Sequence, residues 1–199
     1  MADLTIEGIG QIKPSSIKGD VWLTCIECGK TYPPFDFVIY RCQKCGGLLE
    51  VRYENLPTFE DFSGSGVWRY RASLPFEMGV SIKEGNTPLY TVPRIESDVG
   101  VEALRIKHEG MNPTGSFKDR GMTVGVRVVQ ELGVKRLACA STGNTSASLA
   151  AYGSRAGLEV IVLLPAGKVA MGKVAQASLH GAKILQLDGN FDECLDIVT

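Results

Sequence analysis

From residue 101 onward, apolar and mixed segments alternate along the chain in the order expected of strands and helices. Apolar runs that predict strands occupy residues 101–108, 136–140, 159–164 and 182–187. Helix-like runs occupy residues 117–132, 145–155 and 169–180, each followed within two residues by a glycine, and another helix begins at residue 191. Such glycines commonly end helices. This alternation predicts an α/β fold in which helices cover both faces of a parallel sheet formed by the four strands.

Two pairs of cysteines dominate the N-terminal part of the chain. Cys25 and Cys28 form the first pair, Cys42 and Cys45 form the second, and a glycine follows each pair. Four thiolates at this spacing can close a tetrahedral zinc site, which is structural because no coordination position stays open. Strand-like segments flank both pairs, so we predict a small zinc-ribbon-like module over residues 1–55. A redox centre, or a metal-free remnant of such a site, is the alternative interpretation.

The composition changes after this module. Residues 56–84 mix polar and aromatic positions with a Ser-Gly-Ser-Gly run at 63–66, and we interpret them as a linker. Residues 85–199 then form the start of the α/β domain. The helix that begins at residue 191 reaches no C-terminal capping signal, so we expect the chain to be a fragment of a longer protein.

Composition and charge narrow the classes of function. Hydrophobic residues make up 44% of the 199 positions and charged residues 22%, as in a soluble globular protein. The formal net charge is −1 and no basic block occurs, so extended nucleic-acid or anionic-membrane binding has no electrostatic support. No apolar run approaches the roughly 20 residues of a membrane span, and the N-terminus lacks a signal-peptide core. We therefore expect a cytoplasmic protein without membrane or nucleic-acid partners.

The strongest candidate for chemistry is Lys118, within the stretch Asn-Pro-Thr-Gly-Ser-Phe-Lys-Asp-Arg-Gly at 112–121. Ser116 and Asp119 form a capping-box-like signature that starts a helix at Phe117. Lys118 then lies in the first turn, where the helix dipole disfavours a cation. The same field favours the neutral amine that a nucleophilic or Schiff-base lysine needs. The alternative interpretation is a solvated lysine that tolerates a small penalty.

Two further loops carry polar residues at predicted strand ends. Residues 141–146, Ser-Thr-Gly-Asn-Thr-Ser, offer hydroxyls, an amide and backbone N–H groups at a helix start, which can seat a carboxylate or phosphate. Lys168 lies in the next such loop, and Lys173 follows on the helix that this loop opens. Each feature alone is also typical of ordinary helix caps and solvated lysines. Their coincidence at one edge of a parallel sheet favours a shared site.

Few catalytic arrangements fit the remaining residue types. His108 and His180 are the only histidines, so a Ser-His-Asp arrangement has few candidates. No phosphate-binding P-loop and no Gly-x-Gly-x-x-Gly fingerprint occurs in the sequence. A lysine that forms a Schiff base with pyridoxal phosphate fits the set, because this cofactor supplies its own electron sink.

The motifs at 112–121 and 141–145 together resemble the fold-type II pyridoxal-phosphate enzymes, which are related to the tryptophan synthase β-subunit. Within that group the chain is most similar to the threonine synthase family. The closer match rests on Glu-Gly-Asn-Thr-Pro-Leu at 84–89, on Pro-Ala-Gly-Lys at 165–168 with Gly-Lys at 172–173, and on Gly-Asn-Phe-Asp at 189–192. The paired-cysteine module also resembles one that some threonine synthases carry.

The resemblance implies a role for each candidate residue. Lys118 would hold pyridoxal phosphate as a Schiff base and move protons on the substrate carbons. Asn144 would hydrogen-bond the 3′-oxygen of the cofactor ring, and Phe117 would pack near that ring. The substrate α-carboxylate would be held by polar residues of the second loop, Ser141, Thr142 and Thr145. The substrate phosphate would meet Lys173 and Lys168.

The reaction implied by the resemblance is loss of phosphate from O-phospho-L-homoserine and addition of water, which gives L-threonine and orthophosphate. The family has a glycine-rich loop that binds the cofactor phosphate and a hydroxyl residue that bonds the pyridine nitrogen. Neither has a match in residues 1–199. We therefore expect this portion to be inactive or nearly so by itself, and the full-length protein to be a homodimer. The alternatives are a threonine or serine dehydratase, a cysteate synthase, or a zinc-ribbon interaction protein with a non-catalytic α/β domain.

Overall fold

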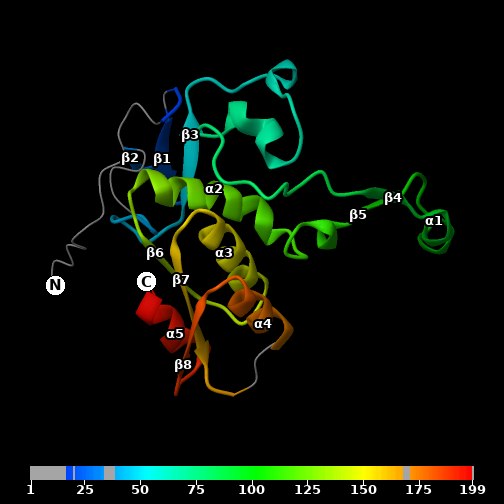
Figure 1. Cartoon of the computed structure of the whole chain (residues 1–199). Coiled ribbons are helices and arrows are strands. Elements are labelled where there is room, and N and C mark those ends of the chain that lie inside the picture. The colour runs from blue at the N-terminus through cyan, green and yellow to red at the C-terminus, as the bar shows by residue number, and fades with distance from the viewer. Residues whose placement is uncertain (1–16, 20, 34–38, 168–170, 199) are drawn as a thin grey trace. The chain divides into compact units, whose positions relative to one another are not determined.

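The computed structural model in Figure 1 describes residues 17–19, 21–33, 39–167 and 171–198. These residues divide into two compact units. The first unit draws on Met1–Gly64, Trp68–Gly79 and Arg127–Val134, and the second on Ser65–Val67, Val80–Val126 and Lys135–Thr199. Helix α2, Lys118–Glu131, contributes residues to both units. The division into 1–55, 56–84 and 85–199 stays a prediction.

The first unit contains a three-stranded antiparallel sheet in the order β2-β1-β3. Its strands are β1 (Val21–Cys25), β2 (Thr31–Tyr32) and β3 (Leu49–Tyr53). In β1, Val21, Leu23 and Cys25 are buried while the residues between them are partly exposed, which is the alternation of a strand with one buried face. Residues 39–41, within the strand-like run before the second cysteine pair, form no strand, and residues 37–38 lie outside the described part. Short 3-10 turns follow at η2 (Phe59–Asp61) and η3 (Val67–Ser73).

The second unit is built on a three-stranded parallel sheet in the order β6-β7-β8. The strands are β6 (Arg136–Ala140), β7 (Glu159–Pro165) and β8 (Lys183–Leu187). The helices that follow them are α3 (Asn144–Arg155), α4 (Met171–Leu179) and α5 (Phe191–Val198). Helices α3 and α4 pack together on one side of the sheet, and α5 packs on β6 and β7 from the other side (Figure 1). The predicted parallel sheet with helices on both faces is confirmed for these strands.

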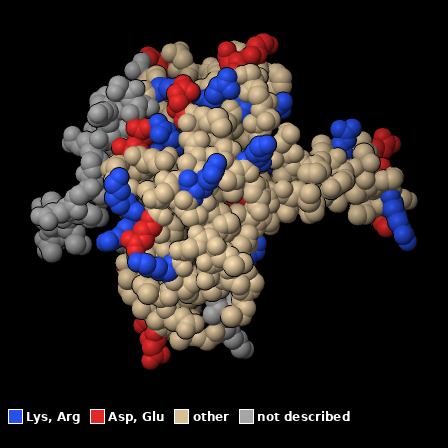
Figure 2. Space-filling view, viewed as in Figure 1, with Lys and Arg blue, Asp and Glu red and all other residues tan. Residues whose placement is uncertain are grey.

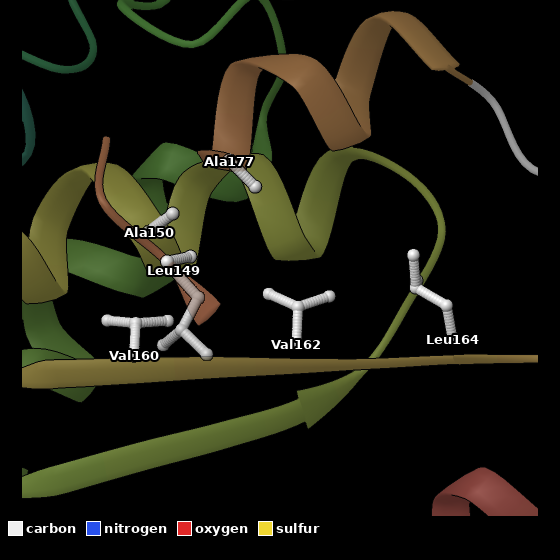
Figure 3. Close-up of a cluster of buried hydrophobic side chains, with 7 residues drawn as sticks. Leu149, Ala150, Val160, Val162, Leu164 and Ala177 are labelled. Atoms are coloured by element: carbon white, nitrogen blue, oxygen red, sulfur yellow. The ribbon is translucent and has the colours of Figure 1, made fainter. Parts of the chain in front are cut away.

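The core of this unit lies between β7 and the helices above it. Figure 3 shows Val160, Val162 and Leu164 pointing from β7 towards α3 and α4. Small residues line the helix side, so the helix approaches the strand closely: a Cβ placed on Gly153 would lie 2.5 Å from Val160 Cγ2. Burial of such apolar side chains contributes roughly 25 cal/mol per Å² removed from water, so this layer stabilises the sheet.

The strand predicted at 101–108 does not join the parallel sheet. Strand β5 (Arg105–Lys107) pairs antiparallel with β4 (Leu89–Thr91), and α1 (Pro93–Val99) connects the two. Every residue of both strands is exposed. The physical reason lies in the sequence, because charged Arg105 and Lys107 flank Ile106, whereas strands buried on both faces of a parallel sheet are apolar throughout. A 3-10 turn, η4 (Glu109–Met111), follows β5.

The predicted helix ends agree with the structure to within about two residues. The glycines at 133, 157 and 181 have φ angles of 69°, 74° and 84°, in the left-handed region that ends helices without steric cost to glycine. The predicted start of α4 at residue 169 lies outside the described residues.

Charged residues of both signs lie on the surface (Figure 2). On the face shown in Figure 2, lysines and arginines are interspersed with aspartates and glutamates. Within the described part of the chain, no helix is long and apolar enough to cross a membrane.

Candidate functional site

Lys118 begins helix α2 directly after a tight loop. The Gly115 N–H donates to the Asn112 carbonyl at 2.8 Å, and Gly115 has a φ of 80°, which favours glycine at this position. The Lys118 N–H donates to Ser116 Oγ at 3.3 Å. The Lys118 side chain is half-buried, with Nζ 4.8 Å from the centre of the exposed Phe117 ring. The predicted placement of this lysine in the first helical turn is therefore confirmed, although the helix starts one residue later than predicted.

Asp119 does not form the predicted capping box with Ser116. Its carboxylate instead accepts hydrogen bonds from the Thr114 N–H at 2.7 Å and from Thr114 Oγ1 at 2.5 Å. It also accepts one from Ser148 Oγ at 2.7 Å. The turn at Gly115 brings Thr114, and not Ser116, next to this carboxylate. Asp119 has no exposed surface, so three neutral donors compensate a fully desolvated side chain.

The second predicted loop leads into α3. Gly143 is the N-cap of this helix and provides no side-chain cap, while the Ser146 hydroxyl donates to the Gly143 carbonyl at 2.7 Å. No side chain among the described residues of this loop caps the helix as an ordinary Ser, Thr or Asn would. Asn144 is exposed at the first helical position, and the other predicted residues are half-buried: Ser141, Thr142 and Thr145. The helix start thus presents polar groups and a positive dipole end, which suits an anion.

Lys173 on α4 reaches the loop that precedes Lys118. Its Nζ donates to the Thr114 carbonyl at 2.8 Å and to Gln176 Oε1 at 3.3 Å. The same ammonium lies 3.4 Å from the position that a Cβ on Gly115 would occupy. Lys168 lies outside the described residues, so the structure places only one of the two predicted lysines.

Two side-chain contacts join the loop before Lys118 to helices α3 and α4. Asp119 connects the loop before Lys118 to α3 through Ser148, and Lys173 connects the same loop to α4 through Thr114. The loop before Lys118 thus contacts both helices, although β5, the strand that precedes it, lies outside the parallel sheet, so the predicted meeting of three loops at one edge of that sheet stays a prediction. Thr114 accepts from α4 with its carbonyl and donates to Asp119 with its hydroxyl and N–H, so it is the common point of attachment.

Sequence reasoning missed a buried carboxylate directly before the Gly-Asn-Thr-Pro loop. Glu84 is 1% exposed and accepts hydrogen bonds from Ser81 Oγ at 3.0 Å, from the Ile82 N–H at 3.0 Å and from the Tyr152 hydroxyl at 2.9 Å. Burial and the Glu84 carboxylate raise the pKa of Tyr152 well above its ordinary value. The only sequence signal was a charged residue within a motif, and nothing in the local pattern paired it with a tyrosine 68 positions later.

The sequence also did not reveal a cluster of charged and polar residues that ties the loop at 85–88 to the loop before Lys118. Arg120 Nε lies 2.7 Å from Glu109 Oε2, and Thr87 Oγ1 donates to Glu109 Oε1 at 2.9 Å. The Gly85 N–H donates to Asn112 Oδ1 at 2.8 Å. The Arg120 guanidinium, with the other donors, holds the pKa of Glu109 at about 2. Two loops far apart in sequence are thus tied by charged and polar groups that face each other.

The four paired cysteines converge in the first unit, as their spacing predicts. Their sulfur atoms all lie within 4.8 Å of one another. Cys25 Sγ is 3.5 Å from Cys45 Sγ, and Cys28 Sγ is 3.6 Å from Cys42 Sγ. A tetrahedral zinc site with Zn–S bonds of about 2.3 Å has sulfur atoms about 3.8 Å apart. Both measured separations are close to this value, so the four thiols could hold one metal ion.

Local backbone geometry supports this cluster. The Gly29 N–H donates to the Cys25 carbonyl at 3.0 Å and the Gly46 N–H donates to the Cys42 carbonyl at 2.8 Å, with φ angles of 70° and 75° at the glycines. These two turns wrap the chain around the sulfurs in the same way. The trailing glycines predicted as turn residues are confirmed in that role.

Tyr32 supplies a second layer of contacts around Cys42. The Tyr32 hydroxyl accepts from the Gln43 N–H at 2.9 Å, so its own proton is free to be donated to Cys42 Sγ, 3.1 Å away. This hydrogen bond lowers the pKa of the Cys42 thiol to about 6. The tyrosine thus favours the thiolate, which is the form that binds metal.

Comparison with known proteins decides the family. Residues 80–199 match the family of pyridoxal-phosphate dependent enzymes. The chain belongs to this family. Membership of the pyridoxal-phosphate dependent enzymes supports the cofactor class that the lysine and loop motifs predict.

The relatives of this pyridoxal-phosphate dependent enzyme include proteins named threonine synthase. The chain is 57% identical over 182 residues to that of Methanosarcina acetivorans, covering 88% of this chain and 45% of the relative. It is 54% identical over 184 residues to that of Methanocaldococcus jannaschii, covering 87% of this chain and 45% of the relative. The structure of maize serine racemase matches 56% of this chain and 35% of that chain at 25% identity, with a TM-score of 0.50. The chain spans 45% of the length of these two threonine synthases.

Proposed function

We propose that this chain is the N-terminal portion of a threonine synthase, which converts O-phospho-L-homoserine and water into L-threonine and orthophosphate. The observation that carries the proposal is the attachment of the loop before Lys118 to α3 and α4, through the contacts of Asp119 with Ser148 and of Lys173 with Thr114. The two relatives named threonine synthase support the choice within the family.

The residues around Lys118 fit pyridoxal phosphate. Lys118 is half-buried at a helix start, and a Cβ on Gly143 would meet nothing within 4 Å, so there is open space at the start of α3. Asn144 would donate to the ring oxygen from this helix start, and Phe117 would pack near the ring. When bound, the cofactor supplies an electron sink for charge that develops on the substrate carbons. Lys118 Nζ would hold the cofactor and move protons on those carbons.

The substrate would meet two anion sites. The α-carboxylate would lie at the N-terminus of α3, where the dipole and the backbone N–H groups favour negative charge. Its polar partners there would be the half-buried residues Ser141, Thr142 and Thr145. Lys173 Nζ, which lies against the loop before Lys118, would bind the substrate phosphate together with Lys168.

The cysteine cluster would hold one structural zinc ion. Its four sulfurs lie within 4.8 Å of one another, and all four positions would be filled by protein, so no position would stay open for catalysis. The small three-stranded sheet buries few side chains by itself, which makes metal binding a source of its stability.

Phosphate release tests the proposed reaction. The assay uses the full-length protein, in which this chain is continued to the length of its relatives, with pyridoxal phosphate and O-phospho-L-homoserine. We expect phosphate and L-threonine in equal amounts. Lys118→Ala should abolish release and the visible adduct with the cofactor, whereas Lys135→Ala, at an exposed lysine, should change neither. Preference for O-phospho-L-serine would overturn the proposed substrate. Absence of any adduct on Lys118 would overturn the proposal that the protein is a pyridoxal-phosphate enzyme.

A further inference from the structure

Helix α3 carries three polar residues at intervals of four, Asn144, Ser148 and Tyr152. Residues spaced by four lie along one side of an α-helix, one turn apart. Ser148 and Tyr152 are completely buried, and Asn144 is exposed at the helix start. A helix that buries two hydroxyl groups in line with its exposed first residue has a preferred rotation about its axis.

Buried carboxylates accept from both hydroxyls. Ser148 Oγ lies 2.7 Å from Asp119 Oδ1, and the Tyr152 hydroxyl lies 2.9 Å from Glu84 Oε2. If α3 turned about its axis, both carboxylates would lose a donor inside the protein, and an unsatisfied buried polar group is strongly unfavourable.

The opposite side of α3 packs on the sheet. Leu149, Ala150 and Gly153 lie there, and Leu149 and Ala150 join the buried cluster of β7. The hydrogen bonds of Ser148 and Tyr152 therefore fix the polar side of the helix, while apolar packing holds the other side.

We propose that Asp119 is a positioning residue that fixes Asn144 relative to Lys118. Asp119 follows Lys118 in the chain, holds the preceding loop through Thr114, and holds α3 one turn after Asn144 through Ser148. One carboxylate thus sets both the loop that presents the lysine and the rotation of the helix that presents the amide. The inference rests on the proposed function, in which Asn144 bonds the ring of a cofactor held by Lys118.

The first test needs no cofactor. In the apo form of the full-length protein, hydrogen exchange is compared between wild type, Ser148→Ala and the matched control Ser154→Ala, an exposed serine on the same helix. Ser148→Ala should speed exchange of the Thr114 amide and of the first turns of α3 roughly tenfold, the effect of one lost buried hydrogen bond. Ser154→Ala should leave both unchanged. Equal exchange in all three proteins would overturn the proposal.

The second test uses the pH titration of the visible adduct on Lys118. Asn144→Ala should shift the midpoint of this titration by at least about half a pH unit, because it removes a hydrogen bond to the chromophore. Ser148→Ala should shift it in the same direction, and should add little in the Asn144→Ala background. If Ser148→Ala shifted the midpoint equally in wild type and in the Asn144→Ala variant, positioning through Asn144 would be contradicted.

The two tests separate the inference from the proposed function. Faster exchange at Thr114 and α3 in Ser148→Ala, with a midpoint shift that depends on Asn144, supports the inference. Failure of wild type to form any adduct would overturn the proposed function, and with it the role of Asp119 toward the cofactor. If wild type forms the adduct but Ser148→Ala leaves its titration midpoint unchanged, the inference is overturned and the proposed function is not.

Discussion

Tyr152 and Glu84 meet inside the second unit, where the phenol donates a 2.9 Å hydrogen bond to a carboxylate that is 1% exposed. The two residues are 68 positions apart, and their contact ties α3 to the segment that leads into the Gly-Asn-Thr-Pro loop. Ser81 and Ile82 supply the other donors to this carboxylate. A buried acid is thus held by three donors from two distant parts of the sequence.

Replacing Tyr152 by Phe should destabilise the protein. The variant keeps the ring in place but removes one donor from a buried carboxylate, a change that typically costs about 1–3 kcal/mol. Urea unfolding of the full-length protein at pH 7 measures the effect. Ser154→Ala is the control, because Ser154 is an exposed residue whose hydroxyl bonds only to the Ala151 carbonyl of its own helix, and it should unfold within about 0.5 kcal/mol of wild type. Unchanged stability in Tyr152→Phe would contradict the structural role of the contact.

The same phenol predicts a difference in alkaline stability. Burial and Glu84 raise the pKa of Tyr152 above its ordinary value of 10.0, so the folded state retains the proton that the unfolded state loses. The stability that this raised pKa contributes is fully present below pH 10 and is lost as the pH rises above 10. Wild type should therefore lose more stability than Tyr152→Phe between pH 9 and pH 11. Urea midpoints across this range check the prediction, and parallel curves would contradict it.

Gly153 predicts a packing effect that an open glycine should not show. A Cβ at this position would lie 2.5 Å from Val160 Cγ2 inside the core, so Gly153→Ala should destabilise by about 1–3 kcal/mol. Gly125 lies within α2, where an added Cβ meets nothing within 4 Å. Gly125→Ala should therefore stabilise by about 0.5–1 kcal/mol through higher helix propensity. Thermal unfolding of both variants measures the contrast, and effects of the same sign would contradict the close approach of α3 to β7.

Local patterns were sufficient to predict most of the second unit. The run Val160-Ile161-Val162-Leu163-Leu164 predicts a strand buried on both faces, and β7 is the central strand of the parallel sheet. The helix-ending glycines and the lysine at the start of α2 also follow from near neighbours in sequence. Such features depend on a few adjacent residues, which a single sequence displays completely.

Features that depend on distant partners were missed or misassigned. The strand at 105–107 was assigned to the parallel sheet, because its pairing with β4 across α1 has no local signature. Asp119 was expected to cap its own helix through Ser116, but its carboxylate bonds Thr114 and Ser148. A hydrogen-bond acceptor selects whichever donor the tertiary fold brings near it, and sequence spacing alone does not reveal that choice. The roles assigned to the residues around Lys118 stay predictions.

The ion pair of Glu109 and Arg120 predicts a loss of stability in acid. Arg120, with Thr87 and Asn112, lowers the pKa of Glu109 from 4.5 to about 2. The folded state therefore binds this proton less tightly than the unfolded state does. The resulting stability is present above pH 4.5 and is lost as the pH falls from 4.5 towards 2. Glu109→Gln should be less stable than wild type at pH 7, and the difference should shrink as the pH approaches 2.

Urea unfolding at pH 7, 4 and 3 measures this difference. Glu102→Gln is a matched control, because Glu102 is exposed and should give nearly the wild-type curve at every pH. A constant difference between Glu109→Gln and wild type at all three values would mean that the carboxylate contributes through packing and not through its charge.

Removal of metal should act on the first unit. With four thiolates around one ion, the purified protein should contain about one zinc per chain. Cys45→Ser removes a ligand and should lower the zinc content strongly, whereas Cys139→Ala, a cysteine of strand β6, should leave it unchanged. A chelator should also abolish hydrogen-exchange protection in β1, β2 and β3, because metal binding stabilises small modules whose cores are limited. Protein that retains this protection without metal would contradict a structural zinc site, since the sheet would then be stable on side-chain packing alone.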